Sequence, residues 1–100
     1  MIKSELIASL SSKFSHLPER EIKEVVDCII ETMVNALEEG QKIEIRDFGV
    51  FSIKNMKERN ARNPKTGETV LTPASRKVHF KQGLGLKKRI NASKNKIVEE

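Results

Sequence analysis

Residues 55–75 constrain the fold most, because they offer very little apolar surface for a core. The apolar side chains of this stretch are too few to pack inward: Met56, Ala61, Val70, Leu71 and Ala74. A segment this polar should project from the body of the protein as a two-stranded β-ribbon arm. Such a ribbon is marginal alone in water, so we expect it to be mobile until a partner orders it.

The middle of this segment has the composition of a tight reversal. It reads Arg-Asn-Pro-Lys-Thr-Gly over residues 62–67. Pro64 fixes its own φ and pushes Asn63 toward extended geometry, while Gly67 can supply the positive φ that a reversal often needs. The hexapeptide is therefore predicted to form the tip of the arm.

Charge is divided unevenly along the chain, whose net charge is +5. Residues 1–50 carry 6 basic and 10 acidic side chains, whereas residues 51–100 carry 13 basic and 4 acidic ones. A basic half indicates nucleic acid or an anionic membrane surface as partner, and an acidic half argues against a uniformly sticky polycation. Because the basic half contains the predicted tip, the arm is interpreted as a DNA-gripping element.

The first half predicts two helices. Apolar residues recur at helical spacing from Lys3 to about Phe14, with Ser4 as a candidate start. Pro18 is a good entry to a second helix, which should run to about Glu38, with Gly40 as the C′ residue that follows it.

The core should be small and aliphatic. The chain has 100 residues, 37% of them hydrophobic, with four Phe and no Trp or Tyr. A domain of this size buries a limited fraction of its surface, so a second copy or a partner subunit should supply the missing burial. The core positions of the second helix share one apolar stripe: Ile22, Val25, Val26, Ile29, Ile30, Met33, Val34 and Leu37.

Alternating residues predict a small antiparallel sheet, which makes the fold class α+β. Residues 43–46 and 50–53 should be strands joined by a turn at 47–49, and residues 76–81 should return as a third strand. Val78 and Phe80 share one face of that third strand.

The end of the chain is expected to hold a short helix and a tail. A basic helix is predicted from Leu86 to about Ala92, which completes a single domain over residues 1–92 with its arm at 55–75. Residues 93–100 should fray, and no function is assigned to them.

Several classes of protein are disfavoured. The one cysteine, Cys28, cannot form an internal disulfide, and neither a membrane span nor a signal peptide is evident, which predicts a soluble protein in a reducing compartment. His16 and His79 lack further ligands at metal spacing, so neither metal nor cofactor is expected. The acidic residues suit helix exteriors and not a catalytic cluster, which argues against an enzyme, a nuclease included.

Three segments besides the tip carry a family resemblance: residues 3–7 (KSELI), residues 43–51 (IEIRDFGVF) and residues 78–81 (VHFK) with Gly83. With the tip, they closely resemble the bacterial histone-like family that includes HU and integration host factor. Residues 43–46 and 79–81 are most similar to the beta subunits of integration host factor. The family usually has glycine at position 61, where this chain has Ala61. It often has Pro and Lys where this chain has Gln82 and Leu84, so one flank contact should be missing.

The resemblance implies an intertwined dimer that binds the minor groove of double-stranded DNA and bends it. Pro64 would be the apolar wedge, and Arg62 and Asn63 would donate to acceptors on the groove floor. Cations along the arm would hold phosphates or groove walls: Lys57, Arg59, Lys65 and Arg76.

Two further sets of residues follow from the resemblance. Glu44 and Arg46 would contribute to sequence preference, with the carboxylate pairing with the arginine on one strand face; an ordinary surface ion pair is the other interpretation. Flanking DNA would be clamped at its backbone by Lys3, Ser4, Lys81, Lys87, Lys88 and Arg89.

The function expected from the resemblance is architectural, in nucleoid organisation, recombination, replication and transcription control in the bacterial cytoplasm. The partner chain would be a second copy or an alpha-like subunit. A sequence-neutral, HU-like packaging protein, or one that favours RNA or damaged DNA, is the main alternative. A protein-interaction module that uses the acidic face of the second helix is another, and its binding would survive high salt.

Overall fold

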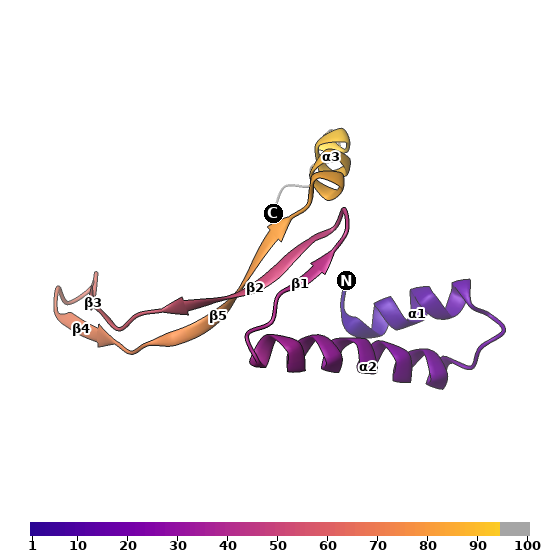
Figure 1. The fold of residues 1–100 in the computed structure, drawn as a ribbon, viewed down its shortest axis with the longest axis horizontal. Coiled ribbons are helices and arrows are strands. Elements are labelled where there is room, and N and C mark those ends of the chain that lie inside the picture. Colours follow the sequence, from indigo (N-terminus) through magenta and orange to yellow (C-terminus); the bar gives the residue numbers. More distant parts are fainter. Residues whose placement is uncertain (95–100) are drawn as a thin grey trace. The chain divides into compact units, whose positions relative to one another are not determined.

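The computed structural model describes residues 1–94 and separates them into two compact units, with the boundary between Ala36 and Leu37. The first unit is helical, and the second contains the sheet, the arm and a third helix (Figure 1). The α+β class is confirmed. The predicted tail falls mostly on residues 95–100, outside the described residues, and the single domain over 1–92 stays a prediction.

The helical unit contains α1 (Lys3–Lys13) and most of α2 (Glu19–Glu38), close to the predicted bounds. Ser4 is not the start of α1, because the extended residue Ile2 precedes the helix and its carbonyl accepts the Leu6 N–H at 3.1 Å. Pro18 opens α2 as expected, and its carbonyl accepts N–H groups from the first turn. The two helices meet through Ile7, Ile22 and Val26, with Leu10 packed against them.

The second unit is built on a three-stranded antiparallel sheet in the order β1-β2-β5. Its strands are β1 (Ile43–Ile45), β2 (Gly49–Met56) and β5 (Ser75–Gln82). Both β2 and β5 are longer than predicted, because their pairing continues to Met56 opposite Ser75.

Three aromatic side chains cluster on one face of this sheet. Phe51 lies opposite Phe80 with ring centroids 4.7 Å apart, and Phe48 lies 5.6 Å from Phe80. Val78 occupies the matching position two residues along β5, opposite Ile53, which confirms the predicted face. The ring of Phe80 also covers Gly49, where an added Cβ would come within 2.5 Å of it.

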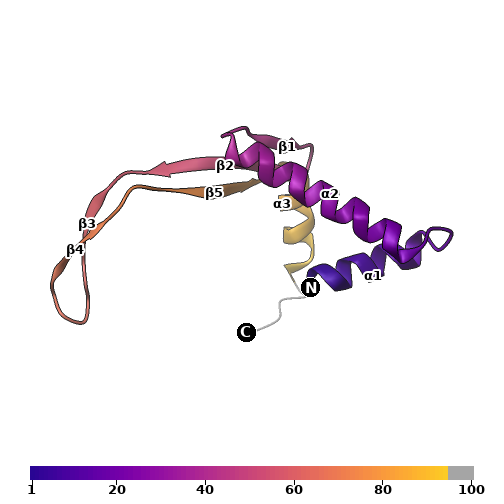
Figure 2. The same ribbon diagram turned by 90° about the horizontal axis from the view of Figure 1, so that it is seen from below.

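The arm contains a separate ladder of β3 (Arg59–Arg62) and β4 (Thr69–Thr72). Figure 2 shows β2 and β5 leading into this hairpin. The ladder is interrupted between the sheet and the hairpin, at residues 57–58 and at Pro73 and Ala74. Proline has no N–H to donate to a ladder, which explains the break on that side.

The last helix, α3 (Leu84–Ala92), begins two residues before the predicted start at Leu86. Its first turn is bonded to the β1–β2 turn: Gly83 N–H donates to the Phe48 carbonyl at 2.9 Å, and Leu86 N–H donates to the Asp47 carbonyl at 2.8 Å. This long-range support allows the helix to start within Gly-Leu-Gly, a poor helix-forming sequence.

The chain leaves much apolar surface exposed. Among the described residues only Ile7, Ile22 and Val26 are buried hydrophobics, so the core is small and aliphatic as expected. The predicted core stripe of α2 was largely wrong for the single chain, because only Ile22 and Val26 of its members are buried and Val25, Ile29, Ile30 and Val34 are exposed. Exposed apolar side chains occur on all three helices and on the sheet, including Val25, Ile29, Ile30, Val34, Ile45, Phe48, Val78, Phe80, Leu84 and Ile90. Within residues 1–94, no helix is long and apolar enough to cross a membrane.

Gly49→Ala should lower the free energy of unfolding by about 1–3 kcal/mol, since the added methyl meets the Phe80 ring at 2.5 Å and the Lys81 carbonyl at 2.7 Å. Urea denaturation at one fixed protein concentration measures the change. Ser52→Thr, which adds a methyl elsewhere on β2, is the control and should have a smaller effect. Equal stability of the Gly49 variant and the original chain would contradict this packing.

Candidate nucleic-acid interface

The tip of the arm is a closed turn organised by Asn63. Its N–H donates to the Glu68 carbonyl at 2.8 Å, and its carbonyl accepts the Gly67 N–H at 2.7 Å. Its side-chain Oδ1 also accepts the Lys65 N–H at 2.9 Å. Gly67 has φ +73°, as predicted for this reversal. Pro64 is exposed at the turn and has no N–H of its own to satisfy.

Arg62 and Asn63 keep donors for a ligand. The Arg62 Nε donates to the Gly67 carbonyl at 3.3 Å and braces the turn, while the guanidinium carries further N–H groups. The Asn63 amide uses its oxygen within the turn, and its NH₂ group carries two donors. Donors beside an exposed apolar residue suit a surface that presents mainly acceptors.

The base of the tip does not need glycine. Ala61 lies in β3 opposite Val70, and within residues 1–94 Asp47 is the only non-glycine residue with positive φ. The alanine is thus accommodated in ordinary strand geometry. The remaining cations of the arm, Lys57, Arg59 and Lys65, are exposed and join no ion pair in the described part of the chain.

Arg76 differs from the other predicted arm cations. It lies on β5 opposite Asn55, and its Nη1 donates to the backbone carbonyl of Glu38 at 3.1 Å. The structure therefore places this guanidinium at the end of α2.

Glu44 and Arg46 are both exposed, but the expected pairing between them is not formed. Glu44 is the central residue of β1, opposite Val50, whereas β1 ends at Ile45 and Arg46 follows it. The two-residue period of a strand therefore does not extend to Arg46. No ion pair joins the two side chains in the part of the chain that the structure describes.

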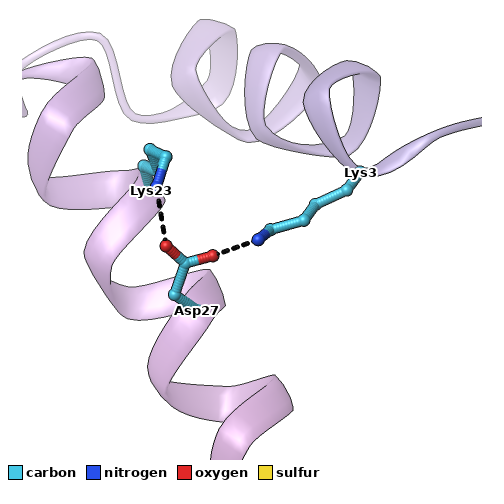
Figure 3. Close-up of polar contacts among 3 residues, drawn as sticks. All are labelled: Lys3, Lys23 and Asp27. Atoms are coloured by element: carbon cyan, nitrogen blue, oxygen red, sulfur yellow. Dashed lines mark hydrogen bonds and ion pairs between the residues drawn. The ribbon is translucent and has the colours of Figure 1, made fainter.

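Lys3 is engaged within the helical unit (Figure 3). Asp27 on α2 forms an ion pair with Lys3 and accepts a 2.8 Å hydrogen bond from Nζ of Lys23. The bond from Lys23, and then that from Lys3, holds the pKa of the Asp27 carboxyl below its usual range. The hydrogen bond to Asp27 in turn raises the pKa of Lys23.

Two cations near the start of α2, Arg20 and Lys23, lie beside the predicted flank residue Ser4. Ser4 lines a groove between α1 and α2 whose other polar walls are Glu19, Arg20 and Lys23. Arg20 and Lys23 lie three residues apart on α2, so they share one face of the helix.

The other predicted flank residues are exposed in the second unit. Lys81 lies near the end of β5 opposite Val50, and Lys87, Lys88 and Arg89 lie on α3. Among residues 1–94 no cluster of three or more His, Cys, Asp and Glu could hold a metal ion.

Comparison with known proteins gives consistent matches over nearly the whole chain. A family model described as bacterial DNA-binding protein matches residues 1–91. Integration host factor subunit beta from Methylococcus capsulatus is 47% identical over 95 residues, which cover 95% of this chain and 100% of that protein. The same subunit from Halorhodospira halophila is 44% identical, with 95% and 93% covered.

Solved structures agree with these sequence matches. The structure of Anabaena HU crystallised with DNA has a TM-score of 0.78 and 31% identity, covering 90% of this chain and 97% of that one. An HU variant from Thermotoga maritima has a TM-score of 0.64 and 28% identity, covering 90% and 99%.

The ion pairs of Asp27 should make the free energy of unfolding decrease as the pH becomes acidic. Because its folded-state pKa is lowered, its contribution is present above the unfolded value of about 3.9 and is lost as pH falls through the folded value. Asp27→Asn should therefore be less stable than the original chain at pH 7, and the difference should shrink at pH 3. Urea denaturation at both pH values measures this.

Glu31→Gln removes a carboxylate of α2 that joins no ion pair among the described residues, and it is the matched control. It should not reproduce the pH-dependent difference. A difference for Asp27→Asn that is the same at pH 3 and pH 7 would show that the ion pairs do not contribute to folding.

Proposed function

The chain belongs to the bacterial DNA-binding protein family that includes HU and integration host factor, and we propose that it binds the minor groove of DNA and bends it as a dimer. The activity is architectural, with no reaction catalysed and no cofactor. It serves nucleoid organisation, recombination, replication and transcription control in the bacterial cytoplasm.

The geometry of the arm tip carries this proposal. Pro64 is exposed on a turn whose backbone groups are bonded to one another through Asn63. A compact apolar side chain on a thin hairpin suits insertion between base pairs, where it would unstack one step and kink the duplex. HU and integration host factor are established examples of such minor-groove binders.

The polar groups around Pro64 suit the rest of the groove. Arg62 and Asn63 would donate to N3 of adenine and O2 of thymine, which are the acceptors that the minor groove presents. Lys57, Arg59 and Lys65 would bind phosphates along the arm, with an affinity that falls steeply with salt.

A second chain is required for two arms, and the exposed apolar surface supports its presence. Val25, Ile29 and Val34 on α2, with Phe48 and Phe80 on the sheet, are too exposed for a chain that functions alone. The partner would be a second copy or an alpha-like subunit. The name of the similar proteins, subunit beta, favours the latter.

The bent duplex would be held on its flanks by the remaining cations. Lys81, Lys87 and Lys88 would contact the DNA backbone from the second unit, and Lys3 and Ser4 from the start of α1. Lys3 would have to exchange its ion pair with Asp27 for a phosphate. These contacts add affinity and leave base choice unchanged.

If the protein prefers particular DNA sites, the preference would come from the region of Arg46. The second candidate function is sequence-neutral packaging of DNA. The similarity to integration host factor subunit beta supports preference for a site, with Glu44 nearby on β1. The likeness to the Anabaena HU structure supports packaging, because the same arm suits any easily kinked duplex.

Pro64→Ala should keep the fold and change the DNA dissociation constant by less than about tenfold, because phosphate contacts dominate affinity. The bend should be reduced, since the wedge is blunted. Titration of end-labelled duplexes of about 35 base pairs, read by anisotropy and energy transfer at two salt concentrations, separates the two effects; that length is about three helical turns. Thr66→Ala is the control at the tip. A bend equal to that of the original chain would remove Pro64 from the mechanism.

Arg46→Ala should weaken binding to a preferred site by about 1–3 kcal/mol and binding to a scrambled duplex by less. The same titration measures both, alone and with an alpha-like subunit added. Lys42→Ala removes a nearby exposed cation and should weaken the two duplexes equally. Equal losses for Arg46→Ala would make it a phosphate contact and favour packaging.

A further inference from the structure

The side chain of Arg76 lies against the C-terminal end of α2, 38 residues earlier in the chain. Its Nη1 donates to the Glu38 carbonyl at 3.1 Å. An added Cβ at Gly40 would lie 3.6 Å from its Nη2, so the guanidinium also covers the reversal that follows the helix. Two observations thus place the same group at the same helix end.

This end of α2 lacks any local compensation of its negative potential. The last turn contains no basic residue, and the helix finishes at Glu38 with Glu39 immediately after it. Carbonyl groups at a helix C-terminus carry partial negative charge and favour a cation. In α1 the cation at the C-terminal end comes from the helix itself, because Lys13 lies in its last turn. For α2 the cation comes from β5.

On β5, Arg76 occupies the root of the arm. It pairs with Asn55, one position before the ladder of β2 and β5 ends at Met56 and Ser75. Beyond that point the strands are unpaired until Arg59 and Thr72 begin the hairpin of the arm. The contact with Glu38 is therefore made one pair before the end of the ladder that leads into the arm.

We propose that Arg76 is a positioning residue, which fastens the root of the arm to the last turn of α2 and so sets the direction in which the arm leaves the sheet. A guanidinium suits this role because its fixed fork can bond a carbonyl and cover the adjacent turn together. The importance of this direction for DNA rests on the proposed function. The bond itself is present without DNA and can be tested without it.

Hydrogen exchange on the free protein is the first test. In Arg76→Ala, the amides of Gly40 and of residues 75–77 should exchange about tenfold faster, because a hydrogen bond to a charged donor is lost. Arg59→Ala, which removes an arm cation that makes no such contact, should leave these amides unchanged. Arg76→Lys should restore part of the protection, since it keeps a cation at the helix end. Unchanged exchange in Arg76→Ala overturns the proposal.

Salt-dependent DNA binding is the second test. Loss of one phosphate contact should lower the slope of log affinity against log salt by about 1, which is the result expected for Arg59→Ala. Arg76→Ala should keep the original slope while the end-to-end distances of the bound duplex broaden. A slope lowered by about 1 in Arg76→Ala, with an unbroadened distribution, overturns the proposal. Absence of DNA binding by the original chain would contradict the proposed function, and the exchange result would still decide the role of Arg76.

Discussion

The antiparallel pairing of β2 with β5 determines the position of nearly every other feature of the second unit. It runs from Gly49 opposite Gln82 to Met56 opposite Ser75. One end brings Phe51 against Phe80 and holds the β1–β2 turn to which α3 is bonded. At the other end, Arg76 bonds to the end of α2, and the register of Met56 with Ser75 continues in the arm as Arg59 opposite Thr72. Since a slip by one residue would reverse every side chain, this ladder aligns the arm as well as the sheet.

The apolar side chains are sufficient to define the elements but not to enclose a core. Only Ile7, Ile22 and Val26 are buried among the described hydrophobic residues, while the aromatic cluster of the sheet remains partly exposed. A small domain with so little burial gains little stability from its own packing. The proposed second chain would cover this exposed surface, so folding and association would be coupled and stability would depend on protein concentration.

Sequence patterns predicted the elements well because most of them rest on local signals. Helical spacing, Pro18 and Gly40 located α1 and α2, and Pro64 with Gly67 located the tip turn. The start of α3 was predicted two residues late, because bonds to Phe48 and Asp47 extend that helix into a glycine-containing segment. Local propensity does not include such distant support.

The sequence shows where the cations are but not which of them are already bonded within the protein. Charge counting treats Lys3, Arg59 and Arg76 alike, yet Lys3 is paired with Asp27 and Arg76 is bonded to Glu38, whereas Arg59 joins no ion pair in the described residues. A cation with an internal partner must give up that contact before it can bind phosphate, so its net contribution to affinity is smaller. Among the described residues, the arm cations Lys57, Arg59 and Lys65 join no ion pair, so an anionic ligand would meet a smaller internal cost there than at Lys3 or Arg76.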